Sequence, residues 1–100
     1  MAVIFAALGD DTRLMIISKL QDGSDHSISK LTQGLSLTRQ GVSRHLLVLE
    51  KANLVHRHHV GRETRYHLEV ETLSQAKDYL ARASAQWDDA MDRLSRHLGG

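Results

Sequence analysis

The feature that most constrains the fold of this chain is a regular stripe of apolar and small residues in its last third. Alternating steps of three and four residues separate its members, which are Leu73, Ala76, Leu80, Ala83, Trp87, Ala90 and Leu94. This spacing predicts one helix over residues 71–98, about 40 Å long. A small domain does not cover a helix of that length, so the stripe favours a partner helix, most simply in a homodimer. A helix that lies across its own domain is the alternative interpretation.

The length and composition limit what else the chain contains. Its 100 residues suffice for one domain with a modest core. The absence of cysteine excludes disulfides, thiolate metal sites and thiol nucleophiles. The sequence shows no signal peptide and no apolar run long enough for a bilayer, so we expect a cytoplasmic protein without a membrane partner.

The first twenty residues predict two helices. A short packing helix is expected at about residues 2–8, and a second helix begins at Asp10 or Asp11, because aspartate suits the N-cap and the helix dipole. The expected apolar face of the second helix consists of Leu14, Ile17 and Leu20, widened by Met15 and Ile16.

A helix-turn-helix is expected over about residues 28–52. A short helix from Ile28 to Gln33 ends at Gly34, and a longer amphipathic helix begins at Thr38. The apolar positions of this longer helix recur at helical spacing and are Val42, Leu46 and Leu49. Asn53 stands where the helix ends, and asparagine tolerates the left-handed backbone that such an end requires.

The polar face of the helix that begins at Thr38 is rich in hydrogen-bond donors and poor in acids. Its members are Thr38, Arg39, Gln40, Ser43 and Arg44. In the major groove, arginine pairs with guanine, glutamine pairs with adenine, and serine or threonine pairs with several acceptors. The face therefore predicts a helix that reads DNA. His45 has two open roles, either as a contact to phosphate or a base edge, or as a partly buried residue bonded to the scaffold.

Residues 55–68 change to a period of two and predict a two-stranded hairpin with a turn at Gly61 and Arg62. One face is expected to cover the core with Thr64, Tyr66 and Leu68, and the other to present Glu63, Arg65 and His67. A basic hairpin after a helix-turn-helix is typical of a wing. Its expected contacts to phosphates or the minor groove are Arg57, Arg62 and Arg65.

The distribution of charge supports this location for a nucleic-acid surface. The chain has a net charge of only +1, but residues 38–68 carry six basic and two acidic side chains. Five of the seven histidines lie in the same segment. The positive charge is therefore concentrated in the predicted recognition helix and wing.

Four stretches of the sequence resemble the ArsR-type winged-helix repressors, and the similarity extends over nearly the whole chain. They are Leu8–Arg13, Val42–Glu50, Leu54–Val55 and Gly61–Arg62. The resemblance implies a mostly α fold with a small β-hairpin, a winged helix-turn-helix with N- and C-terminal dimerisation helices. It also implies a homodimer that represses transcription by binding double-stranded operator DNA at a palindrome. The implied dimer interface includes Phe5, Leu73, Leu80, Trp87, Met91 and Leu94.

The familiar metal-sensing motifs of that family are missing from this sequence. Ser27 and Ser29 stand where some members carry a Cys-x-Cys pair, and hydroxyls are poor ligands for soft metals. The last helix offers only His97 where other members carry several ligands. We therefore expect neither a cofactor nor a bound metal, and the sequence does not identify an effector. A metal-responsive repressor that binds zinc or nickel through some of His56, His58, His59 and His67 is the alternative.

An enzyme is not expected. The chain has no His-Glu-x-x-His motif and no phosphate-binding glycine loop, and Gly34–Thr38 lacks the final glycine of a nucleophile elbow. A protein-interaction module that does not bind DNA is the remaining alternative, and the salt dependence of duplex binding distinguishes it from a repressor.

Overall fold

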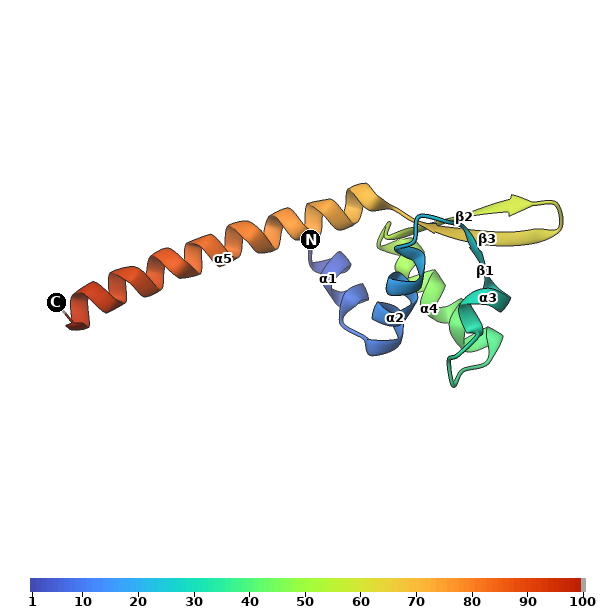
Figure 1. Cartoon of the computed structure of the whole chain (residues 1–100), viewed down its shortest axis with the longest axis horizontal. Helices are drawn as coiled ribbons and strands as arrows, with labels where there is room; N and C mark the ends of the chain where they lie inside the picture. The colour runs from blue at the N-terminus through green and yellow to red at the C-terminus, as the bar shows by residue number, and fades with distance from the viewer. Residues whose placement is uncertain (100) are drawn as a thin grey trace.

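The computed structural model describes residues 1–99, in which a helical domain carries a small sheet and a long C-terminal helix (Figure 1). The helices are α1 Ala2–Leu8, α2 Asp11–Leu20, α3 Ile28–Thr32, α4 Arg39–Lys51 and α5 Val70–Gly99. The strands are β1 His26–Ser27, β2 Val55–Val60 and β3 Glu63–Leu68. The mostly helical architecture with a small β-hairpin, predicted from the sequence, is confirmed.

Short polar side chains fix where the helices of the domain begin. The carboxylate of Asp10 accepts a hydrogen bond of 3.0 Å from the backbone N–H of Arg13 at the start of α2. The hydroxyl of Thr38 accepts one of 3.1 Å from the N–H of Gly41 at the start of α4. Each cap satisfies a donor that the first helical turn would otherwise leave without a partner.

The core lies where α2, α3 and α4 meet the inner ends of β2 and β3. Its largest fully buried side chains are Ile16, Leu20, Leu31, Val42, Leu46, Leu49, Leu54 and Val55. The buried positions of α4 are those predicted from helical spacing.

The predicted apolar face of α2 is partly wrong. Ile16, Ile17 and Leu20 are buried, but Leu14 and Met15 remain 45% and 48% exposed. The face that packs inward continues to Arg13 instead of Leu14, because the Nε–H of Arg13 donates a 2.6 Å hydrogen bond to the carbonyl of Ala7. Because Arg13 is charged, the spacing of apolar residues did not indicate that its position packs inward.

The sheet has three antiparallel strands in the order β1–β3–β2, so the prediction of a two-stranded hairpin was incomplete. The short strand β1 pairs His26 with Tyr66 and Ser27 with Arg65. The hairpin pairs Val55 with Leu68 and Val60 with Glu63 across a turn at Gly61, whose φ is +62°. A strand of two residues is too short to show a period of two, which is why the sequence did not indicate β1.

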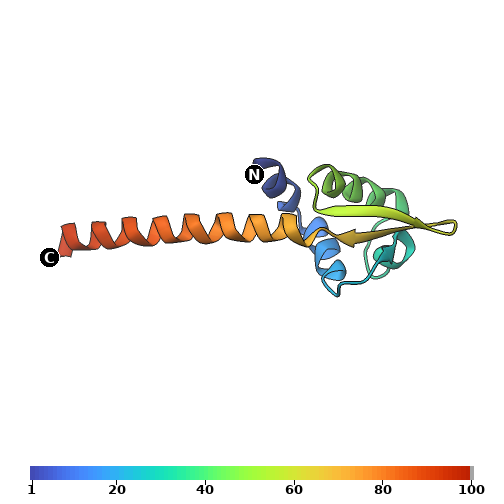
Figure 2. The ribbon, with the colours of Figure 1, turned by 90° about the horizontal axis from the view of Figure 1, so that it is seen from above.

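Helix α5 extends away from the domain in the direction opposite to the hairpin, as both views show (Figure 1 and Figure 2). Its only buried residues are Thr72 and Ala76, within its first two turns, among residues 1–99. The resulting shape is elongated, with extents of 66 × 26 × 22 Å. None of the helices within residues 1–99 has the length and apolarity needed to cross a membrane.

Asn53 connects the end of α4 to the wing and gives a first prediction. Its φ is +59°, and its Nδ2 donates a 3.2 Å hydrogen bond to the hydroxyl of Thr72 in α5. We expect Asn53→Ala to destabilise the fold by about 1–2 kcal/mol, because alanine tolerates the left-handed region less well than asparagine and because the hydrogen bond to Thr72 is lost. Asn53→Gly is the matched control and should cost less, since glycine adopts this backbone freely. Urea unfolding of both variants measures the difference, and equal losses would contradict the backbone explanation.

Candidate nucleic-acid interface

The polar face of α4 is exposed along its first two turns. Val42, Leu46 and Leu49 point into the core, so the opposite side of the helix faces solvent. The exposed side chains there are Arg39, Gln40, Ser43 and Arg44. Thr38 is also exposed, and its oxygen caps the helix while its O–H stays available as a donor. The structure thus presents on one surface the donors that the sequence singled out in the predicted recognition helix.

An open groove lies between the start of α4, the start of α3 and the outer part of the hairpin. Its volume is about 580 Å³. Three of the predicted DNA-contacting residues line it, namely Arg39, Arg62 and Arg65. Ser27 and Ser29 line the same groove, and the hydroxyl of Ser27 caps α3 by accepting a 3.2 Å hydrogen bond from the N–H of Lys30. The fold therefore brings basic residues from distant parts of the chain to one concave surface.

A second groove joins α4 to the inner part of the wing. Ser43, Arg44 and Leu47 of α4 line it together with Arg57 and Tyr66 of the hairpin. Leu47 is 49% exposed there and was not among the predicted contacts. An exposed apolar side chain between donors suits contact with a thymine methyl group. Burial raises the pKa of Tyr66, so its phenol stays neutral.

The five arginines of this surface differ in whether an acid neutralises them. Arg57 Nε lies 3.3 Å from Glu50 Oε1, and Arg65 Nε lies 2.6 Å from Glu63 Oε1. Arg39, Arg44 and Arg62 form no ion pair within residues 1–99. Exposed ion pairs contribute only about 0–1 kcal/mol, so these two pairs hold Arg57 and Arg65 weakly. Arg39, Arg44 and Arg62 therefore carry positive charge that no acid within residues 1–99 pairs with.

His45 turns away from this surface and toward α2. Its Nδ1 lies 3.3 Å from Nη1 of Arg13 and 3.8 Å from Oδ2 of Asp10, and its side chain is 23% exposed. The backbone N–H of Arg13 holds the pKa of Asp10 below its usual value, so this carboxylate is charged at neutral pH. Of the two roles left open for His45, this geometry supports the scaffold role over a contact to DNA.

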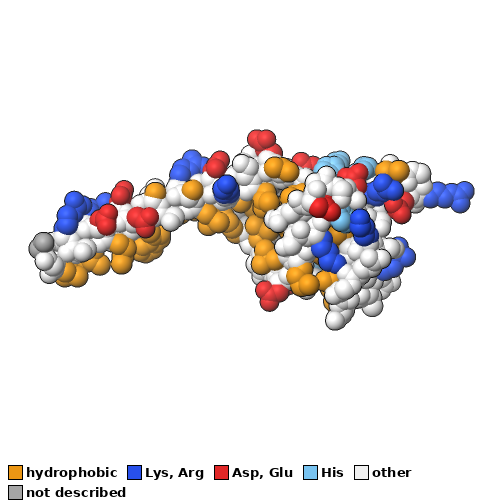
Figure 3. Space-filling model, in the orientation of Figure 1, with side chains coloured by type: hydrophobic (Ala, Val, Ile, Leu, Met, Phe, Trp, Pro, Cys, Tyr) orange, Lys and Arg blue, Asp and Glu red, His pale blue; other side chains and the backbone are white. Residues whose placement is uncertain are grey.

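The apolar side chains of α5 form a second candidate interaction surface. Figure 3 shows hydrophobic side chains along the lower edge of this helix and charged ones along its upper edge. Four predicted interface residues are about half exposed or more: Leu80, Trp87, Met91 and Leu94. The other two pack within the chain, since the ring centroid of Phe5 lies 5.6 Å from that of Tyr79 and Leu73 packs against the core.

The structure separates the four wing histidines. His58 and His67 lie on one face of the sheet and converge on Asp25. His59 lies on the other face, where its Nδ1 is 3.3 Å from the hydroxyl of Thr64. The ring of His56 packs beside that of His67, with centroids 5.4 Å apart. Asp25 was not among the predicted ligands, because no local pattern connects it to a hairpin that begins thirty residues later.

Comparisons with known proteins agree with this geometry. Residues 10–57 match the model of the family described as "Bacterial regulatory protein, arsR family". An ArsR-like transcriptional regulator from Rhodococcus sp. RHA1 has a similar structure, with a TM-score of 0.82 and 35% identity, over 97% of this chain and 91% of that one.

Two curated relatives share part of the sequence. The HTH-type transcriptional regulator YuzN of Bacillus subtilis is 43% identical over 58 residues, 52% of this chain and 63% of its own length. An HTH-type transcriptional regulator of Methanocaldococcus jannaschii is 39% identical over 54 residues, 54% of this chain and 61% of its own length. The chain thus spans less than two thirds of these two relatives.

Proposed function

The chain belongs to the ArsR family of bacterial regulatory proteins, and from that premise we propose that it is a homodimeric repressor that binds operator DNA. The family consists of transcriptional regulators, a class that is generally not enzymatic. In this proposal α4 lies in the major groove and the β2–β3 hairpin is the wing. A regulator of this kind acts on the chromosome, so the proposal places it in the cytoplasm without a membrane partner.

The observation that carries the proposal is that several basic side chains around α4 are exposed and have no acidic partner. Arg39 at the start of α4 lines the same open groove as Arg62 at the wing turn. Arg39, Arg44 and Arg62 have no acid partner within residues 1–99. We assign base-edge contacts to Thr38, Arg39, Gln40, Ser43 and Arg44, and phosphate or minor-groove contacts to Arg57, Arg62 and Arg65. His45 is assigned to the scaffold that holds α4 against α2.

The exposed stripe of α5 supports the proposed homodimer. Trp87 is 69% exposed and Leu80 is 55% exposed on a helix that leaves its own domain. A second copy of α5 would cover this stripe, and two-fold symmetry would then present two recognition helices to one duplex. The two half-sites of a palindrome should lie about 34 Å apart, or a multiple of that distance.

The salt dependence of binding tests the proposal. A duplex selected by the protein from a random pool should bind tightly at 50 mM salt and about 10³-fold more weakly at 200 mM, if the dimer neutralises six or more phosphates. Arg62→Ala should reduce the slope of log affinity against log salt by about one for each protomer. Fluorescence anisotropy with a labelled duplex measures both quantities. Absence of duplex binding at low salt would reject the repressor and favour the protein-interaction module.

A further inference from the structure

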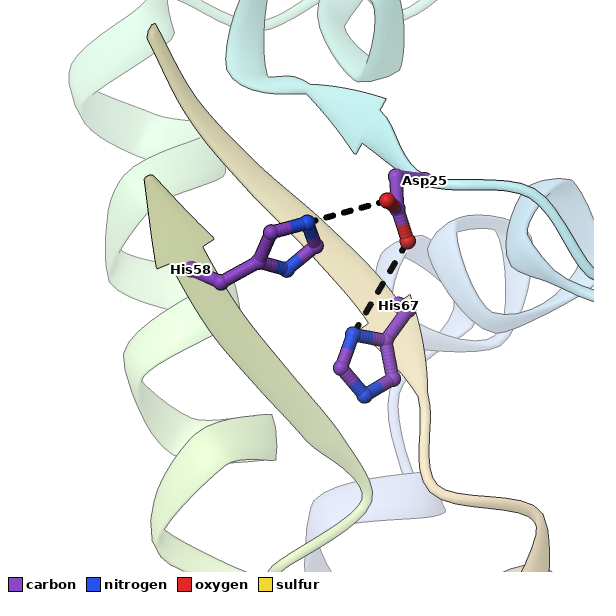
Figure 4. A group of neighbouring side chains, drawn as sticks. All are labelled: Asp25, His58 and His67. Atoms are coloured by element: carbon purple, nitrogen blue, oxygen red, sulfur yellow. Dashed lines mark ion pairs between the residues drawn. The ribbon is translucent and has the colours of Figure 1, made fainter. Parts of the chain in front are cut away.

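One face of the sheet gathers two imidazoles around a carboxylate (Figure 4). Nε2 of His58 lies 2.9 Å from Oδ2 of Asp25, and Nδ1 of His67 lies 3.8 Å from Oδ1 of the same residue. One ligand atom from each of the three side chains lies within 4.8 Å of the others. The three residues come from the segment before β1 and from both strands of the wing.

The strand register explains why these side chains meet. β1 pairs His26 with Tyr66, so Asp25 comes beside His67, one residue farther along each strand. β2 pairs His56 with His67 and His58 with Arg65, and alternation therefore puts His58 on the same face as His67. The opposite face carries Tyr66, which is buried in the core, and Arg57, which pairs with Glu50 of α4. The cluster is thus separated from α4 by the thickness of the sheet.

We propose that Asp25, His58 and His67 bind a divalent transition-metal ion, and that Zn²⁺ is the ion that this ligand set suits best. Neutral imidazole is a good ligand for zinc, and carboxylate is a common third ligand. Tetrahedral zinc with bonds of about 2.0–2.1 Å holds its ligand atoms about 3.3 Å apart, so the site closes by side-chain adjustments of about 1 Å. Three protein ligands leave the fourth position to water.

The surroundings of the two histidines support ligand geometry. Nε2 of His67 lies 3.3 Å from Oε1 of Glu69, while its Nδ1 lies 3.8 Å from Oδ1 of Asp25. The second nitrogen of a metal-binding histidine characteristically lies near a carboxylate, a carbonyl or water, which orients the ring. Nδ1 of His58 is buried without a hydrogen-bond partner within residues 1–99. The orientation of that ring therefore depends on the contact between its Nε2 and Asp25. An open pocket of about 520 Å³, lined by all three ligands, gives an ion access.

The site connects segments of the fold that are distant in the sequence. A bound ion would join the segment before β1 to both hairpin strands, whose other end carries Arg62 in the turn. If the proposed repressor function holds, metal occupancy would act on DNA affinity through the position of the wing. The binding of the ion itself does not depend on that function and is measured without DNA.

The test is a calorimetric titration of untagged, chelator-treated protein with ZnCl₂, followed by Co²⁺ binding monitored by visible absorption. We expect one ion per chain and a melting temperature that rises with free Zn²⁺, because a ligand that binds only the folded state stabilises it. His58→Ala, His67→Ala and Asp25→Asn should each weaken binding at least about 100-fold, more than loss of an outer hydrogen bond does. His59→Ala is the matched control, because its side chain lies on the other face, and it should bind like the unmodified protein.

Two outcomes would overturn the proposal. No saturable Zn²⁺ binding would mean that the cluster is a set of ion pairs only. Binding that survives both His58→Ala and His67→Ala would put the ion elsewhere. Imidazole ¹⁵N shifts of the unmodified protein, with and without Zn²⁺, identify the ligating histidines even if a variant fails to fold. If the protein did not bind DNA, the Zn²⁺ titration, the melting temperature and the ¹⁵N shifts would still be unchanged. The proposed zinc site and the proposed repressor function are therefore tested independently.

Discussion

Replacing both Leu80 and Leu94 with glutamate is expected to convert the protein to a monomer and to abolish tight operator binding. These side chains are 55% and 48% exposed in the single chain, on the stripe that the proposed partner helix covers. Full burial of an exposed leucine contributes about 1.5–3 kcal/mol, so covering the exposed half of four leucines contributes about 3–6 kcal/mol. Dimerisation should therefore weaken by about 10²- to 10⁴-fold, since about 1.4 kcal/mol corresponds to a factor of ten.

Ala85→Glu is the matched control for this double variant. Ala85 lies on the opposite side of α5 and is exposed, so a glutamate there adds charge without entering the stripe. Light scattering gives the mass of each variant, and circular dichroism checks that the helices remain. If the double variant stays dimeric with its helices intact, the partner helix does not pack on this stripe and the proposed interface is wrong.

The elements of the fold were predictable wherever a local pattern of the sequence specifies them. Val42, Leu46 and Leu49 repeat at helical spacing and are all buried in α4. Asn53 has the left-handed backbone, with φ +59°, that its place after a helix indicates. Such signals depend on residues a few positions apart, so no tertiary information is needed to detect them.

The features that the sequence did not reveal depend on contacts between distant segments. His45 looked equally suited to DNA and to the scaffold, and only the position of α2 places Arg13 Nη1 at 3.3 Å from it. Leu14 was expected inside with Ile17 and Leu20, yet Arg13 takes the inward position and lies over the end of α1. Asp25 joins His58 and His67 only through the pairing of a two-residue strand.

Arg44→Ala is expected to weaken binding to the selected operator by about 1–3 kcal/mol at each half-site, or about 5- to 150-fold. The guanidinium is exposed beside Ser43 and Leu47, on the side of α4 opposite its buried residues. The guanidinium has no ion-pair partner within residues 1–99, so Arg44→Ala does not leave a carboxylate without its counter-charge. An arginine that reads a guanine discriminates against the other bases, and the variant should therefore lose its preference at one position of each half-site.

Arg62→Ala is the matched control for Arg44→Ala, because it removes the same group from the turn of the wing, where a phosphate contact is expected. This variant should weaken binding to all duplexes by a similar factor and leave base preference intact. Competition among duplexes that differ at single half-site positions separates the two effects. Equal losses across all duplexes for both variants would show that Arg44 contacts the backbone, and sequence reading would then fall to Gln40 and the other donors of α4.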